Sequence, residues 1–207
     1  ADLESKTADP VMLYGLAVKW DGAYTASFDV AQANSDDNLP VTKGDKKMES
    51  VSASIKCAAN VGDKYVMYYS MSVWGGEWTC GIGCAVADRP EGPFVDKGKL
   101  FRSNEIGVKN SIDPFYIEEN GHKYLFWGSF RGIYWIELSE DGFSVKPGAK
   151  PQLVAGTAFE GTYIHKHGGK YYFFGSVGTC CEGVKSTYRT DVGRSDSLFG
   201  PYVDKEG

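Results

Sequence analysis

Two carboxylates head apolar segments that look like buried strands. Asp113 stands in the stretch SIDPF and Glu160 in the stretch FEGTY. An ionised carboxylate is costly at the start of a buried strand. Two carboxyl groups around a shared cleft suit glycoside hydrolysis, in which one protonates the leaving oxygen and the other activates water. The alternative for Asp113 is that the Asp-Pro pair opens a turn, with the side chain capping a backbone amide.

An internal repeat puts Asp113 and Glu160 at equivalent positions of successive copies. The segments GDKYVMYYSMS (62–72), GHKYLFWGSF (121–130) and GGKYYFFGSV (168–177) each combine a glycine turn, a Lys-Tyr pair and alternating apolar residues. This pattern is typical of a strand entered from a hairpin. The spacing of the copies gives a unit of roughly 50 residues, which favours a propeller or a solenoid.

We therefore predict an all-β fold, and the 26 glycines, 13 tyrosines and 11 phenylalanines agree with short strands and tight turns. The expected architecture is a single β-propeller domain over 1–207, with blades at about 1–47, 48–106, 107–152 and 153–207. The first strand of each blade lines the central channel of a propeller. Asp113 and Glu160 would then face one funnel, and Asp9, which repeats the Asp-Pro pair in ADPVM, would be a third acid.

Charge and composition exclude several functions. A net charge of -5 argues against a nucleic-acid partner. The sequence contains no run of 18 apolar residues, so we predict no membrane insertion. Five cysteines do not make a disulfide scaffold, and Cys80 and Cys84 are expected to be packed thiols. The three histidines are expected at the surface, so no metal site is predicted.

The stretches SIDPFYIEENGHKYLFWGSF, FEGTYIHKHGGKYYFFGS and CCEGVKSTYRTDVGRSD resemble glycoside hydrolase family 43, above all its arabinan endo-1,5-α-L-arabinanases, over about 48–207. The resemblance implies a five-bladed propeller, of which this chain would lack the fifth blade. It also implies an inverting hydrolase of α-1,5-linked L-arabinofuranosyl bonds. Asp9 would be its base, Asp113 the acid that orients substrate and assists the proton donor, and Glu160 the general acid.

The same resemblance implies a plant cell-wall polysaccharide or oligosaccharide as partner and an extracellular or periplasmic location, although the first ten residues do not read as a signal peptide. It implies no cofactor, with a structural ion in the fifth blade as the one exception. A β-xylosidase or α-L-arabinofuranosidase of the same family stays open, as does a carbohydrate-binding propeller without catalysis.

Three further residues are candidates for contact with the sugar. Trp74 in SVWGGEW and Phe130 in GSFRG are expected near the channel mouth, where a ring could stack on a pentose, although either could belong to the core. Cys181 lies with Cys180 in a loop that resembles one lining the arabinanase cleft. These two cysteines could form a vicinal disulfide or remain free thiols.

Overall fold

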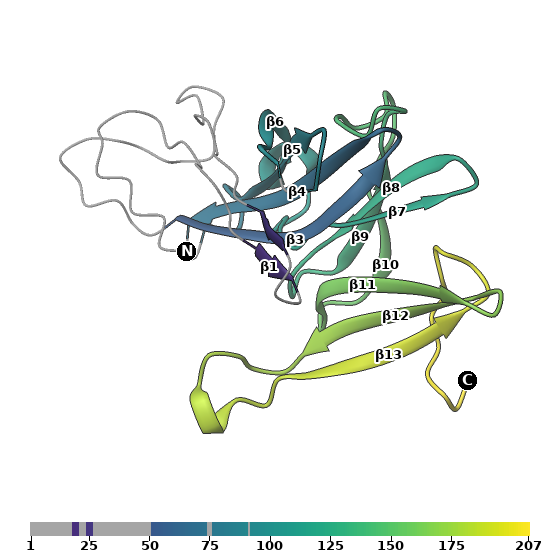
Figure 1. Cartoon of the computed structure of the whole chain (residues 1–207). Coiled ribbons are helices and arrows are strands. Elements are labelled where there is room, and N and C mark those ends of the chain that lie inside the picture. Colours follow the sequence, from purple (N-terminus) through teal and green to yellow (C-terminus); the bar gives the residue numbers. More distant parts are fainter. Residues whose placement is uncertain (1–17, 21–23, 27–50, 74–75, 91) are drawn as a thin grey trace.

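The computed structural model describes residues 18–20, 24–26, 51–73, 76–90 and 92–207. These residues form β-sheets joined by turns, and the helices are single short turns, so the all-β prediction is confirmed (Figure 1). The expected first blade, 1–47, lies almost entirely outside the described residues. Two short paired strands are described there, β1 (Val18–Trp20) and β2 (Tyr24–Ala26).

The first large sheet runs in sequence order through β3 (Val51–Val61), β4 (Lys64–Val73), β5 (Gly81–Ala87) and β6 (Val95–Arg102). All neighbouring strands are antiparallel, as expected for a meander with short turns. The small residues of β5 let it lie fully buried. A Cβ at Gly83 would lie 2.5 Å from the ring of Tyr69 on β4, so any other residue would force that ring to move.

The second sheet repeats this arrangement with β7 (Phe115–Glu119), β8 (His122–Trp127), β9 (Ile133–Glu137) and β10 (Gln152–Ala155). The short helix α1 (Ser103–Ile106) joins the first sheet to it. Because β10 pairs with β9, this sheet extends just past the expected blade boundary at about 152.

The third sheet contains β11 (Glu160–His167), β12 (Lys170–Val177) and β13 (Arg189–Ser195). A bridge between Arg194 and Val203 adds a rudimentary fourth strand. A loop with the 3-10 turn η1 (Gly183–Lys185) separates β12 from β13 and projects from the end of the sheet (Figure 1). In all three sheets the repeated Lys-Tyr segment forms the second strand, β4, β8 or β12, which confirms its prediction as a strand entered from a hairpin.

Apolar side chains fill the spaces between successive sheets. One core cluster joins the first and second sheets and includes Tyr68, Ile82 and Trp127. A second cluster joins the second and third sheets around Phe126, Ile164 and Phe173. Burial of these side chains is the main force that holds the three sheets together, since apolar surface removed from water stabilises the fold.

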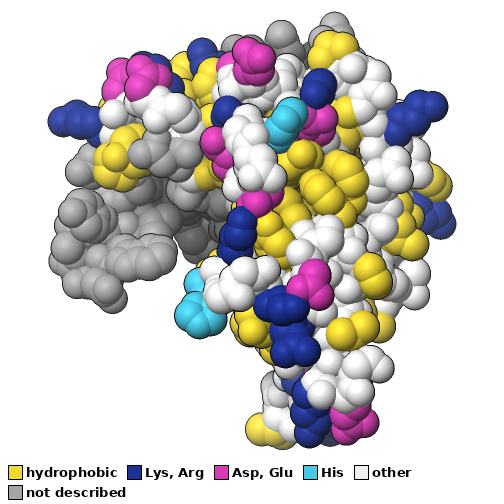
Figure 2. Space-filling view, turned by 90° about the vertical axis from the view of Figure 1, so that its right-hand side faces the viewer, with side chains coloured by type: hydrophobic (Ala, Val, Ile, Leu, Met, Phe, Trp, Pro, Cys, Tyr) yellow, Lys and Arg dark blue, Asp and Glu magenta, His cyan; other side chains and the backbone are white. Residues whose placement is uncertain are grey.

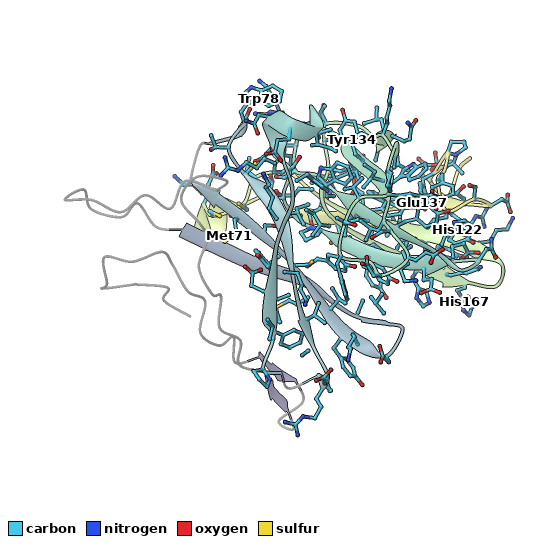
Figure 3. All side chains as sticks on the ribbon, turned by 90° about the horizontal axis from the view of Figure 1, so that it is seen from above. Met71, Trp78, His122, Tyr134, Glu137 and His167 are labelled. Atoms are coloured by element: carbon cyan, nitrogen blue, oxygen red, sulfur yellow. The ribbon has the colours of Figure 1, made fainter. Side chains whose placement is uncertain are left out.

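The histidines lie at the surface as predicted, because all three are exposed. Figure 2 shows histidine side chains on the outside of the face that it presents. His122 binds Glu137 at 2.7 Å between Nδ1 and Oε1, and Figure 3 shows this pair at the edge of the molecule, away from Met71. Cys80 and Cys84 are fully buried, which confirms them as packed thiols.

Candidate active site

Asp113 lies two residues before β7 in an uncommon backbone conformation. Its φ is +61°, in the left-handed region that non-glycine residues rarely adopt, and it directly precedes Pro114. The residue is 5% exposed, and its backbone N–H donates to Oγ of Ser70 on β4 at 2.9 Å. A backbone outlier of this kind often marks a functional site, because surrounding structure must hold it in place.

Glu160 is the first residue of β11, and each of its carboxylate oxygens accepts a hydrogen bond. The Ser129 hydroxyl donates to Oε2 at 2.7 Å, and the Tyr188 hydroxyl donates to Oε1 at 2.5 Å. Ser129 and Glu160 also form an antiparallel backbone bridge between the second and third sheets. The side chain is therefore fixed from two sides while it remains partly accessible to solvent.

Asp113 and Glu160 belong to one region of the molecule. The Asn110 side chain, from the loop that leads to Asp113, donates to the Ser129 carbonyl oxygen at 2.9 Å. The pKa of Tyr188 is raised to about 12, first by its burial and then by its bond to Glu160, with the charges of Glu160 and Asp113 adding to the effect. The bond between Asn110 and Ser129 therefore links the loop that leads to Asp113 with the residue that binds Glu160.

Of the four other predicted site residues, the structure describes Phe130 and Cys181. Asp9 and Trp74 lie outside the described residues. Phe130 is half-buried with φ +50°, and its backbone N–H donates to the Phe159 carbonyl oxygen at 2.9 Å, directly beside Glu160. Cys181 is exposed in the loop between β12 and β13, where its sulfur lies 2.7 Å from that of Cys180, and both are free thiols.

Sequence reasoning missed the residues that hold the two acids: Ser70, Ser129 and Tyr188. A signal for the serines is present in the repeat, because Ser70, Ser129 and Ser176 each stand six residues after the lysine of their copy. Ser70 bonds to Asp113 and Ser129 to Glu160, so the serine of one sheet contacts the acid that heads the next sheet. The repeat therefore carries the support of the site as well as its strands.

The family model of the glycosyl hydrolases family 43 matches residues 38–207. The chain belongs to this family. Its curated relatives include an extracellular endo-α-(1→5)-L-arabinanase of Bacillus subtilis, 37% identical over 152 residues, which cover 70% of this chain and 46% of that protein. Another is an extracellular exo-α-(1→5)-L-arabinofuranosidase of Cellvibrio japonicus, 33% identical, covering 69% of this chain and 47% of the relative. The family 43 chain thus spans about half the length of these relatives.

The fold is similar to those of solved arabinanase structures. The native arabinanase of Bacillus subtilis superposes with a TM-score of 0.61 at 32% identity, covering 72% of this chain and 53% of that one. An exo-1,5-α-L-arabinanase from a bovine ruminal metagenomic library superposes with a TM-score of 0.68 at 27% identity. The match covers 99% of this chain and 72% of that one.

The described part of this family 43 chain offers neither a membrane-spanning helix nor a cluster of metal ligands. Its described helices are too short to cross a lipid bilayer. Within the same residues, no three His, Cys, Asp or Glu side chains stand together in a way that could hold a metal ion.

Proposed function

We propose that this family 43 chain is part of a glycoside hydrolase that cleaves the α-1,5-linked L-arabinofuranosyl bonds of arabinan with inversion of configuration. The observation that carries the proposal is the carboxylate of Glu160, fixed by two hydroxyls in the same region as buried Asp113 with its left-handed backbone. The names of the relatives support the substrate, since they include arabinanases and an arabinofuranosidase that act on α-1,5 bonds.

In the proposed reaction Glu160 is the general acid and Asp9 is the base. Water attacks the anomeric carbon and gives its proton to Asp9 as the glycosidic bond breaks, while Glu160 gives its proton to the departing oxygen. Asp113 binds a sugar hydroxyl and, through its charge, favours the protonated form of the neighbouring acid. In an inverting enzyme the base and acid stand about 6.5 to 9.5 Å apart, which leaves room for the water.

The proposal includes the architecture that would enclose this site. The described sheets are taken as blades of a five-bladed propeller, each contributing its first strand to a central channel. Trp74, Phe130 and Cys181 would contact the sugar at the mouth of that channel. We further propose that the protein works without a cofactor, outside the cytoplasm, on plant cell-wall arabinan. A structure of the natural full-length protein should contain five sheets around one axis.

A second candidate, exo-acting α-L-arabinofuranosidase activity, is favoured by the relative from Cellvibrio japonicus. Endo and exo enzymes share the same acids and differ in how much of the chain the cleft admits. The products separate them: an endo enzyme releases a ladder of oligosaccharides early in the reaction, whereas an exo enzyme releases one product of fixed length.

The decisive experiment measures new reducing ends from linear arabinan, with the natural full-length protein and its Glu160→Gln variant. Wild type should be active, and Glu160→Gln should lose at least a hundredfold in kcat, because general acid catalysis contributes about 10²- to 10⁴-fold. Glu182→Gln is the matched control, since Glu182 is an exposed carboxylate in the nearby loop. Proton NMR of the first product should show the inverted anomer.

Three results would contradict the proposal in different ways. A wild-type protein that binds arabinan without releasing reducing ends would be a carbohydrate-binding propeller. Full activity of Glu160→Gln would remove Glu160 from the reaction. Activity on xylo-oligosaccharides in place of arabinan would keep the family and change the substrate.

A further inference from the structure

Two hydroxyl groups from different sheets hold the carboxylate of Glu160. Ser129 follows β8 of the second sheet and donates to Oε2, whereas Tyr188 precedes β13 of the third sheet and donates to Oε1. The proposed reaction uses one of these oxygens as a proton donor. It gives no role to Tyr188, although the phenol makes the shorter of the two contacts.

The loop before Tyr188 is built to deliver its ring to one place. Thr179 and Thr187 close the loop at its base through backbone and hydroxyl hydrogen bonds of 3.1 to 3.4 Å. Gly178 allows this closure, because its φ is +91° and a Cβ there would lie 2.5 Å from the Thr187 carbonyl oxygen. The closed loop therefore positions the Tyr188 ring.

We propose that Tyr188 is a positioning residue for the general acid: it holds Glu160 in one orientation and stabilises the negative charge that Glu160 acquires as it protonates the leaving oxygen. The inference rests on the proposed function, since it assumes that Glu160 is the acid.

The chemistry requires the two hydroxyls to act differently during the reaction. When Glu160 carries its proton on Oε2, the Ser129 hydroxyl can rotate and accept a hydrogen bond from that proton, because a serine hydroxyl both donates and accepts. When substrate is bound, the leaving oxygen takes the place of Ser129 as the acceptor of this proton. Tyr188 keeps donating to Oε1. As Oε2 loses its proton to the sugar, charge spreads to Oε1 and the Tyr188 bond strengthens, so the phenol favours the transition state over the ground state.

The test measures kcat and KM for wild type, Tyr188→Phe and the control Tyr163→Phe. Tyr163 lies on β11 with its ring against Phe115 and Phe174, so it offers an exposed tyrosine of the same sheet. For Tyr188→Phe on arabinan we expect kcat to fall about tenfold. An aryl arabinofuranoside with a good leaving group needs little protonation, so its kcat should fall much less.

An equal loss of kcat on both substrates would show that Tyr188 supports the fold only, and would overturn the inference. Kinetic constants of Tyr188→Phe like those of Tyr163→Phe would also overturn it. If Tyr188→Phe does not fold, 3-fluorotyrosine at position 188 replaces it. This stronger donor should change kcat on arabinan more than kcat on the aryl substrate, and an equal effect on both would again overturn the inference.

The outcome for Glu160→Gln separates this inference from the function on which it rests. If wild type and Glu160→Gln are equally active, or neither is active, the proposed function has failed and the inference fails with it. If wild type is active, Glu160→Gln is inactive and Tyr188→Phe resembles wild type, only the role of Tyr188 is wrong.

Discussion

The hydroxyl of Ser70 supports both the fold and the candidate site, and Ser70→Ala should separate the two effects. Ser70 is 3% exposed, and its Oγ accepts the backbone N–H of Asp113 across the boundary between the first and second sheets. Without this oxygen a buried N–H loses its partner. The free energy of unfolding should then fall by about 1 to 3 kcal/mol. The protein should remain folded, because ordinary domains have about 5 to 15 kcal/mol of stability.

Activity should fall further than stability alone explains. The φ of +61° at Asp113 costs about 1 kcal/mol or more and persists only while neighbours hold it. Once the Ser70 bond is lost, the turn can relax and move the carboxylate. A displacement of about 1 Å in an active site can cost about a hundredfold in rate, so we expect kcat/KM on arabinan to fall at least tenfold.

Ser195→Ala is the matched control for this measurement. Ser195 is 8% exposed, and its Oγ also accepts a backbone N–H, that of Ser197 at 3.0 Å, at the far end of β13. Chemical denaturation gives the stability of both variants, and initial rates on linear arabinan give kcat/KM. If Ser70→Ala loses stability but keeps the kcat/KM of Ser195→Ala, the Ser70 bond does not position Asp113 for catalysis.

Two further predictions follow from local geometry. Gly128→Ala should fold poorly, because a Cβ there would lie 2.1 Å from a backbone carbonyl oxygen and φ is +138°, whereas Gly156→Ala meets open space and should keep the wild-type midpoint of denaturation. Equal midpoints for the two variants would refute this account. Cys180 and Cys181 should react with a thiol reagent in the native state, because both are exposed free thiols. Cys84 should react only on unfolding, since burial raises its pKa to about 12. Mass mapping that finds native-state label on Cys84, or none on Cys180 and Cys181, would contradict the assignment.

The sequence predicts the strands of this molecule well because one pattern recurs. The Lys-Tyr segments at 62–72, 121–130 and 168–177 alternate strongly and sit behind glycine turns, and each became the second strand of a sheet. The repeat also predicts Asp113 and Glu160 near the start of the first strand of successive units, and they lie two residues before β7 and at the first residue of β11. Local pattern and tertiary arrangement agree here, which is when prediction from sequence succeeds.

Tyr188 could not be found in the same way. It has no counterpart in the other copies of the repeat, and its contact with Glu160 spans 28 positions and depends on how a loop closes. The left-handed backbone at Asp113 was equally hidden, because a residue before proline is expected to be extended. Both features arise from packing between sheets, which a local pattern does not contain.

The repeated serine explains why the site depends on the assembly of the sheets. Asp113 heads the second sheet but is held by Ser70 of the first, and Glu160 heads the third sheet but is held by Ser129 of the second. Each of these two bonds crosses from one sheet to the next, so it forms only when neighbouring sheets are packed together. A substitution that loosens the core between sheets should reduce activity before it unfolds the protein, because local opening needs less free energy than global unfolding.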